Sequence, residues 1–417
     1  MFGADLRCAS EMKLRDQISR VEIAVLCTIL ILCGCTRHDQ IVISPLSNPA
    51  APGSITPNQT ETPDGQVLLS WLEPDNEGLA LRFAIRGSQQ WTSPQTVVKR
   101  TNFDRYAEAP PWVLSLPDRS LLAVWSEQLP KGTSKWAGNY LYTSVSSDGG
   151  KTWSKPTIIH SDRGNGEHSF ASIAFRDDSS ATIVWLDSRD YDTKHTYRLM
   201  SAVIASTGSV SDEQTVDDDV CTCCPTSLVK TAAGFVAAYR NHTEDETRDI
   251  YTVREDSGKW STGKSLNNDG WHINGCPVNG AALAQRQNLV AIAWYTGIEG
   301  KESVQVGFSN DGGQTFPIIR KIDSTHGDAQ PIGRPTIALL RSGDALVVWI
   351  TRDKGTSHLV AAQVSPRGTG LHPIELSQAT TEGLGYPRMQ ILGSDALVSW
   401  AGAGDSKQIR TALLRTP

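Results

Sequence analysis

The chain has 417 residues, with 39 basic and 45 acidic side chains and a formal net charge of −6. This balance argues against nucleic acid as a partner, because nucleic-acid surfaces are bound through an excess of Lys and Arg. Hydrophobic residues make up 39% of the chain and charged residues 20%, which suits a globular β protein.

The first 35 residues have the pattern of a signal peptide. Lys13, Arg15 and Arg20 precede an apolar run over 23–32, and Leu-Cys-Gly-Cys follows, ending at Cys35. This ending resembles a bacterial lipoprotein box and predicts lipidation of Cys35. A plain secretory signal or an uncleaved anchor is the alternative, and translation can also begin at Met12. We therefore expect an extracytoplasmic lipoprotein, held at the membrane on the periplasmic side or at the outer-membrane surface.

Residues 36–60 are polar and rich in Pro, Ser and Asn, which predicts a tether. Beyond it, a strand-like run that ends in a large aromatic residue recurs seven times, at Trp71, Trp125, Trp185, Tyr239, Trp294, Trp349 and Trp400. The gaps are 54, 60, 54, 55, 55 and 51 residues. A fixed period near fifty residues indicates a propeller or a solenoid.

Each repeat reads as four short antiparallel strands, because apolar positions alternate and turn residues recur between them. Four strands make one propeller blade. We therefore predict an all-β fold, a β-propeller over 61–417 with seven blades. The last repeat ends after its third strand, so part of the preceding tether, near 40–44, is expected to close it. A six-bladed ring with the first repeat misread is the alternative.

Two stretches, 146–153 and 309–316, read Ser-x-Asp-Gly-Gly-x-Thr followed by Trp or Phe. Their aspartates are 163 residues apart, or three repeat lengths. The pattern is the Asp box, and with it the chain resembles the sialidase-like (BNR or Asp-box repeat) β-propeller family. We expect the box to be structural, a turn between the third and fourth strands built on Asp148, Trp153, Asp311 and Phe316.

Turns alternate between the two faces of a propeller, so the segments that enter each first strand lie opposite the Asp boxes. Those segments and the loops after the aromatic residues are rich in polar groups, which predicts a ligand site on that face. The candidates are Glu167, His168, Asp187, Arg189, Arg240, Arg248, Trp271 and Asn279. Ion pairing within the loops is the alternative role for the arginines.

Signal removal leaves four cysteines. Cys221, Cys223 and Cys224 lie in a Cys-x-Cys-Cys-Pro segment, and Cys276 opens Cys-Pro-Val-Asn-Gly in the next repeat. Neighbouring blades place the two segments side by side. Disulfides between blades are expected in an oxidising compartment. The alternative is a Cu(I) or Zn thiolate site with His272 or His168 as a further ligand.

The sialidase resemblance implies a Tyr nucleophile with a Glu partner, an Asp acid and three arginines on the substrate carboxylate. By position, Tyr386, Glu167 and Arg334 are the catalytic candidates, but the Arg-Ile-Pro motif of the first arginine is absent. The chain also resembles bacterial secreted sialidase-like proteins that carry both cysteine segments. The leading hypothesis is therefore a propeller that binds a carbohydrate or protein ligand on its cysteine-bearing face. A sialidase-type glycoside hydrolase and a thiolate metal-handling protein are the alternatives.

Overall fold

The computed structural model describes residues 40–130, 138–322, 329–368, 370, 372–380, 384–402 and 408–417. The expected signal peptide, with Cys35, lies outside the described residues. One compact unit, Ile41–Thr416, holds every strand that the structure describes. Across the described ranges, none of the helices has the length and apolar character required to cross a membrane.

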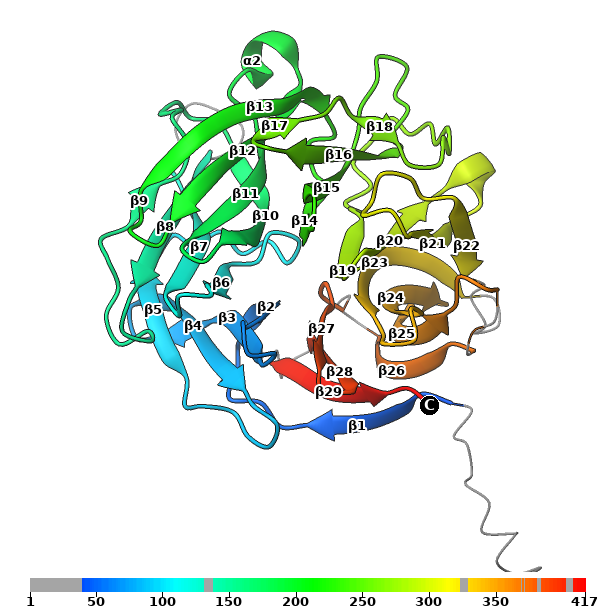
Figure 1. The fold of residues 1–417 in the computed structure, drawn as a ribbon, viewed down its shortest axis with the longest axis horizontal. Coiled ribbons are helices and arrows are strands. Elements are labelled where there is room, and N and C mark those ends of the chain that lie inside the picture. Colours follow the sequence, from blue (N-terminus) through cyan, green and yellow to red (C-terminus); the bar gives the residue numbers. More distant parts are fainter. Residues whose placement is uncertain are drawn as a thin grey trace, which may run out of the picture. The chain divides into compact units, whose positions relative to one another are not determined.

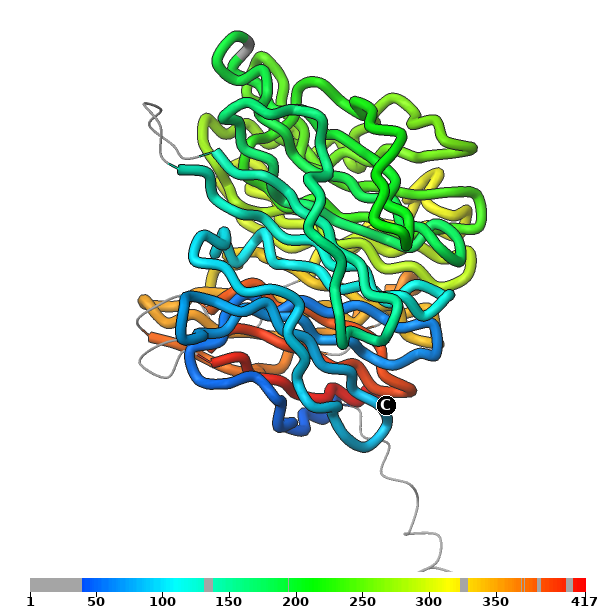
Figure 2. The backbone as a smooth tube through the Cα atoms, turned by 90° about the vertical axis from the view of Figure 1, so that its left-hand side faces the viewer, coloured from blue at the N-terminus to red at the C-terminus, as the bar shows by residue number. Residues whose placement is uncertain are grey.

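Seven antiparallel sheets of four or five strands form a closed ring (Figure 1), so the seven-bladed prediction is confirmed and the six-bladed alternative is wrong. Figure 2 shows the blades of this ring from the side. Blades one to four consist of β2(Ile55–Glu61), β3(Val67–Asp75), β4(Gly78–Arg86) and β5(Gln95–Arg100); β6(Trp112–Ser115), β7(Leu121–Gln128), β8(Asn139–Ser146) and β9(Thr157–Ile158); β10(His168–Asp177), β11(Ser180–Asp187), β12(Tyr197–Ala205) and β13(Val210–Val220); and β14(Ser227–Thr231), β15(Gly234–Arg240), β16(Ile250–Asp256), β17(Lys259–Trp260) and β18(Lys264–Ser265). Blades five to seven consist of β19(Ala282–Arg286), β20(Leu289–Thr296), β21(Ser303–Ser309) and β22(Ile318–Ile322); β23(Gln330–Leu339), β24(Ala345–Asp353), β25(Thr356–Val364) and β26(Ile374–Ala379); and β27(Arg388–Leu392), β28(Asp395–Ala401), β29(Ile409–Arg415) and β1(Val42–Leu46).

The ring closes inside blade seven. Strand β1 pairs antiparallel with β29, with Val42 opposite Arg415 and Leu46 opposite Thr411. The Thr411 hydroxyl also donates to the Leu46 carbonyl at 2.7 Å. The two ends of the unit therefore share one sheet, which removes the open edges of both. Because β1 lies within 36–60 and β2 begins at Ile55, the propeller begins well before residue 61.

The second strand of each blade carries the repeated aromatic residue into the core. Trp71, Trp125 and Trp185 are at most 2% exposed. A buried indole needs an acceptor for its N–H. In these three blades a carboxylate two residues later provides it: Glu73 at 2.7 Å, Glu127 at 2.8 Å and Asp187 at 3.0 Å. In these three blades the indole N–H is thus satisfied locally, while the ring packs in the core.

The Asp boxes form the turns β8–β9 and β21–β22, as expected. Asp148 accepts hydrogen bonds from the backbone N–H of Thr152 at 3.0 Å and from its hydroxyl at 2.7 Å. Asp311 makes the same two bonds to Thr315. Of the two aromatic residues that end the boxes, Trp153 meets the edge of Phe83 in blade one, and Phe316 packs against the core of blades four and five.

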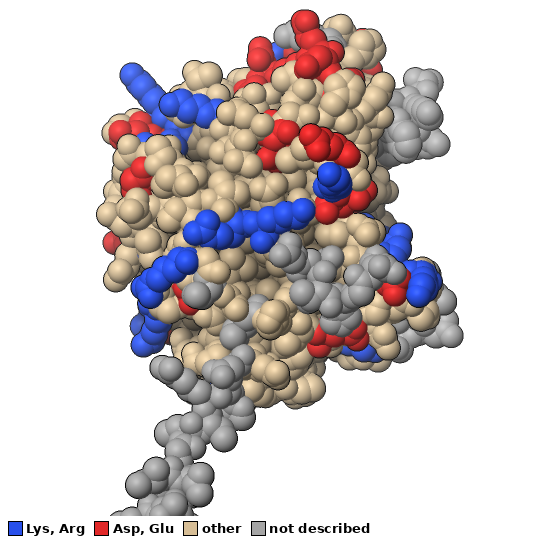
Figure 3. Space-filling model, turned by 90° about the vertical axis from the view of Figure 1, so that its right-hand side faces the viewer, with Lys and Arg blue, Asp and Glu red and all other residues tan. Residues whose placement is uncertain are grey.

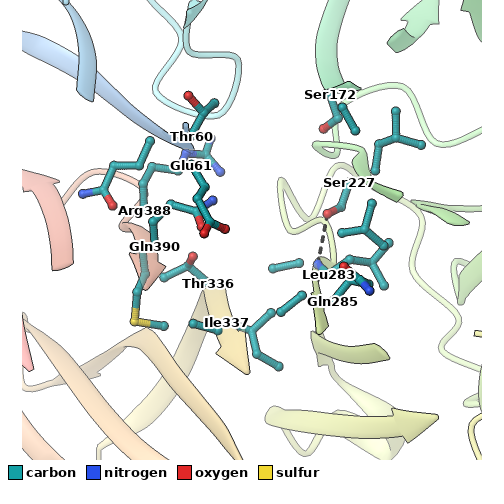
Figure 4. A pocket seen from close by; sticks show the side chains of 18 of the residues that line it. Thr60, Glu61, Ser172, Ser227, Leu283, Gln285, Thr336, Ile337, Arg388 and Gln390 are labelled. Carbon is teal, nitrogen blue, oxygen red and sulfur yellow. Dashed lines mark hydrogen bonds between the residues drawn. The ribbon is translucent and has the colours of Figure 1, made fainter. Parts of the chain in front are cut away.

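The first strands of the blades line a central channel of about 500 Å³. Figure 4 looks into it, with Thr60, Glu61, Arg388 and Gln390 on one side and Ser227 and Leu283 on the other. On the side of the molecule seen in Figure 3, basic and acidic side chains are both present, and neither sign covers the surface.

Candidate functional site on the cysteine-bearing face

All first strands begin on the face opposite the Asp-box turns, which we call the cysteine-bearing face. This follows from the antiparallel order in each blade: the connections into first strands and those from second to third strands share one face. The short helix α2 (Tyr191–Lys194) and the 3-10 turn η1 (Ile298–Gly300) belong to two of these connections. Every predicted ligand residue lies in or next to such a connection.

A buried carboxyl pair lies above blades two and three. Glu167, just before β10, accepts a 2.8 Å hydrogen bond from the hydroxyl of Tyr197, the first residue of β12. Burial raises the pKa of Glu167 to about 7, and the charges of Asp104 and Glu108 add to this effect. Burial also raises the pKa of Asp104 to about 6, although Asn139 donates to it at 3.0 Å. Near pH 7, Glu167 therefore keeps its proton about half of the time.

The connection between β5 and β6 adds two more groups to this pair. Tyr106 is 46% exposed, and its phenol lies within electrostatic range of Asp104, Glu108 and Glu167. Glu108 is half-buried and also acts on Arg388, which lines the channel. The carboxyl cluster of Asp104, Glu108 and Glu167 therefore continues to the mouth of the channel.

At that mouth, two arginines flank Tyr386. The guanidinium of Arg334 lies 5.0 Å and that of Arg388 5.8 Å from the centre of the Tyr386 ring. Tyr386 is 5% exposed and donates its hydroxyl proton to the carbonyl of Val278. Burial raises its pKa. Among the described residues, the tyrosine that donates its hydroxyl proton to Glu167 is Tyr197, not Tyr386.

Arg388 has one unsatisfied polar atom at the mouth. Its Nε atom is buried and has no hydrogen-bond partner among the described residues. Burial lowers its pKa to about 10, so the guanidinium remains charged near pH 7. A buried N–H without an acceptor is costly, and an anionic ligand that accepted from it would offset that cost.

His168 and Asp187 form a separate polar cluster at the start of β10 and the end of β11. The Nε2 atom of His168 lies 3.1 Å from Asp162 and 3.6 Å from Asp187, and its ring stacks on His160 at 3.5 Å. Burial lowers the pKa of His160 to about 3, assisted by His168. Burial opposes ionisation of Asp187, but hydrogen bonds from Arg189 hold its pKa below the usual value. Arg189 also pairs with Glu213, so this cluster is internally satisfied.

Arg240 and Arg248 lie between blades four and five. Arg240 is 2% exposed and donates to the carbonyls of Asn279, Arg248 and Tyr295. Its guanidinium lies 4.9 Å from the centre of the Trp271 indole. Arg240 therefore has a structural role, which is the alternative to the predicted contact with a ligand.

The two cysteine segments lie side by side, as expected. Cys223 and Cys276 form a disulfide with a Cα–Cα distance of 6.0 Å, whereas Cys221 and Cys224 are free and buried. Gly280 is required here, because a Cβ at this position would lie 2.0 Å from the carbonyl oxygen of Pro225. His272 is exposed. His168 is bonded to carboxylates instead, so neither histidine joins the cysteines in the described structure.

The free thiols have different electrostatic environments. A hydrogen bond with Cys224 is the largest cause that lowers the pKa of Cys221, to about 5, and Arg240 and Arg248 contribute. Burial raises the pKa of Cys224. The Nη1 atom of Arg248 donates to Cys221 at 3.3 Å, and the backbone N–H of Asn279 donates to Cys224 at 3.3 Å.

Sequence reasoning missed Asp104, Tyr106, Tyr197 and Arg388. Asp104 and Tyr106 lie in the connection from blade one to blade two, on the same face as the residues that were selected. Sorting all acidic residues by face, rather than only the unusual motifs, would have found Asp104. The Tyr197 contact has no sequence signal, because 30 residues separate it from Glu167.

A model of the BNR repeat-like domain matches residues 75–389. No curated protein sequence matches the chain. An α-L-arabinanase of Penicillium chrysogenum is similar in structure, with 13% identity and a TM-score of 0.45 over 89% of this chain and 96% of that one. A protein of unknown function from Dyadobacter fermentans has 15% identity and a TM-score of 0.48 over 91% and 98%.

A mutant of the NanB sialidase from Streptococcus pneumoniae has 11% identity and a TM-score of 0.44 over 89% of this chain and 71% of that one. These likenesses are too remote to transfer an activity. The domain match, in contrast, spans more than half of the sequence, from the end of β3 to the start of β27. The chain therefore belongs to the BNR repeat-like domain family.

Proposed function

We propose that this protein hydrolyses a glycosidic bond on its cysteine-bearing face, with Glu167 as the proton donor. The observation that carries the proposal is the raised pKa of Glu167, about 7, in a carboxyl group that is only partly exposed. A glycosidic leaving group needs a proton, and a carboxyl group supplies it near neutral pH only where its surroundings keep it protonated.

The neighbours of Glu167 fit the other parts of this chemistry. Glycoside hydrolysis uses a second carboxyl group as base or nucleophile, and the half-buried Glu108 is the candidate. Asp104 is 5% exposed, so its contribution is to raise the pKa of Glu167 by its charge. Tyr106 presents an exposed ring on which the apolar face of a sugar can pack.

The channel mouth suggests that the glycan is anionic. Arg388 lines the channel, and its buried Nε atom has no hydrogen-bond partner among the described residues. Arg334 is the second guanidinium that contacts the Tyr386 ring. A sugar carboxylate would pair with such guanidinium groups. A second candidate function, favoured by the same unsatisfied Nε atom of Arg388, is retention of an anionic glycan without turnover.

A panel of fluorogenic neutral and acidic glycosides tests the proposal. We expect turnover of at least one member, a loss of 10²-fold or more in kcat for Glu167→Gln, and no change for Glu244→Gln, an exposed carboxylate on the same face. Glycan binding without turnover would replace hydrolysis with retention. Turnover that survives in Glu167→Gln would reject Glu167 as the acid.

The location of the protein is part of the same proposal. The lipoprotein-like ending at Cys35 supports a lipid anchor outside the cytoplasm, where a glycan substrate would be met. Mass spectrometry of the membrane fraction tests this, because a diacylated N-terminal cysteine peptide that begins at Cys35 is expected. An unmodified N-terminus at another residue would contradict it.

A further inference from the structure

The four cysteines of the propeller meet at one junction between blades four and five. The Sγ atom of Cys221 lies 3.7 Å from that of Cys224 and 3.9 Å from that of Cys223. The sulfurs of Cys221, Cys223 and Cys224 all lie within 4.8 Å of one another, and Cys276 is bonded to Cys223. Tetrahedral zinc with Zn–S bonds of about 2.3 Å holds its sulfurs about 3.8 Å apart. The two measured separations match this spacing.

We propose that in the fully reduced protein Cys221, Cys223, Cys224 and Cys276 form a thiolate site for a thiophilic cation, Zn²⁺ or Cu⁺. The site joins the loop that opens blade four to the loop that opens blade five. It is independent of the carboxyl cluster proposed to act on glycans.

The surroundings of the sulfurs resemble an outer shell of a metal–thiolate centre. Cys221 accepts a hydrogen bond from the Nη1 atom of Arg248, and Cys224 accepts one from the backbone N–H of Asn279, each at 3.3 Å. Such donors to sulfur orient the ligands and stabilise their negative charge. Asn279 is itself held in place, because its side-chain amide donates to the carbonyls of Pro277 and Ile332.

Charge balance sets how many cysteines each cation binds. Four thiolates around one Zn²⁺ carry a net charge of −2, which the guanidinium groups of Arg240 and Arg248 offset in part, since Arg248 also pairs with Glu246 at 2.6 Å. Arg240 is 2% exposed and lies within electrostatic range of Cys221 and Cys224. The same balance with Cu⁺ requires three thiolates. We therefore expect Zn²⁺ on all four cysteines and Cu⁺ on three of them.

The disulfide between Cys223 and Cys276 withholds two of the four ligands, so the disulfide form and the metal-bound form exclude each other. His272 is exposed, and four thiolates would satisfy the four-coordinate preference of zinc without it. The proposed site thus differs from the site predicted from the sequence, which included a histidine ligand.

The test uses the full chain, reduced and stripped of metal under anaerobic conditions. Titration with Co²⁺ should give one equivalent per chain with the visible absorption of a tetrahedral thiolate complex, and Zn²⁺ should displace it. Competition against a chromogenic Cu⁺ chelator measures the Cu⁺ arm. Alkylation of the unmutated protein followed by mass spectrometry should show that bound Zn²⁺ protects these four cysteines.

Matched variants complete the test. The pair Cys221→Ser and Cys224→Ser should abolish the Co²⁺ spectrum. The variant His272→Ala, which removes the exposed histidine near these loops and no thiol, should leave it unchanged. The absence of stoichiometric binding to the reduced chain, or binding that leaves these four cysteines open to alkylation, would overturn the proposal.

Discussion

The hydroxyl of Tyr197 donates a 2.8 Å hydrogen bond to Glu167, joining the first residue of β12 to the segment that enters β10. This bond stabilises the ionised carboxylate, whereas burial and the charges of Asp104 and Glu108 oppose ionisation. The opposing effects leave the pKa of Glu167 at about 7, where a carboxyl group can both give and regain a proton in neutral solution.

The pH–rate profile should report this balance. We expect kcat/KM on the best glycoside to fall as pH rises through about 7, because Glu167 then loses its proton. Tyr197→Phe removes a hydrogen bond that lowers the pKa of Glu167, so the alkaline limb should move to higher pH while activity at low pH persists. A limb that stays in place in Tyr197→Phe would show that another group titrates.

Glu167 should also leave a signature in stability. The pKa of Glu167 is higher in the folded protein than its ordinary value of 4.5. The protonated carboxyl group therefore stabilises the folded state, and this contribution is fully present below pH 4.5. This contribution is lost as pH rises to about 7 and beyond, a change of about 3 kcal/mol for a shift of this size.

The neutral variant Glu167→Gln has no such loss. In urea denaturation it should match the parent chain near pH 4 and be more stable by roughly 2–3 kcal/mol at pH 8. Equal stability of the two proteins at both pH values would contradict the buried, proton-holding environment of this carboxyl group.

The seven-bladed ring could be predicted because its causes are local and repeated. Trp71, Trp125 and Trp185 recur with the period of a blade, and each is followed by its own acceptor two residues later. The start of the propeller was less visible in the sequence. The strands β1 and β2 have polar residues at many positions, and Asn58 and Thr60 are buried through bonds to carbonyls of blade two.

The candidate site was only partly predictable. Its face followed from the order of strands, and Glu167 was selected for its place in that order. Its partners were not, because Tyr197 and Asp104 reach Glu167 through folding of distant connections. The cysteine pairing could not be predicted either, because any of three neighbouring cysteines could pair with Cys276 by sequence. The folded backbone places Cys223 beside it.

Closure of blade seven should contribute measurably to stability. Ile41, the residue before β1, is 5% exposed and packs with Trp400 in the core between blades six and seven. Ile41→Ala should cost about 2–4 kcal/mol in the free energy of unfolding. Its neighbour Val42 is 37% exposed, so Val42→Ala should change stability by roughly 0.5 kcal/mol or less. Similar urea midpoints for the two variants would argue against closure by β1.

The Asp box should affect stability without affecting the proposed site. Hydrogen bonds from Ser309, Thr315 and Gln314 outweigh burial and lower the pKa of Asp311 to about 2. Its stabilising effect is present above the ordinary value of 3.8 and is lost as pH falls toward 2. Asp311→Asn should therefore lower the melting temperature at pH 7, with glycoside turnover at permissive temperature unchanged. Loss of turnover in the folded variant would show that the two faces are coupled.

The most direct test of the central claim compares two leaving groups. A dinitrophenyl glycoside departs without a proton, whereas an alkyl glycoside of the same sugar requires one. If Glu167 is the proton donor, Glu167→Gln should lose 10²-fold or more in kcat/KM on the alkyl glycoside and little on the dinitrophenyl glycoside. An equal loss on both substrates, or no loss on either, would contradict Glu167 as the acid and with it the proposed hydrolytic site.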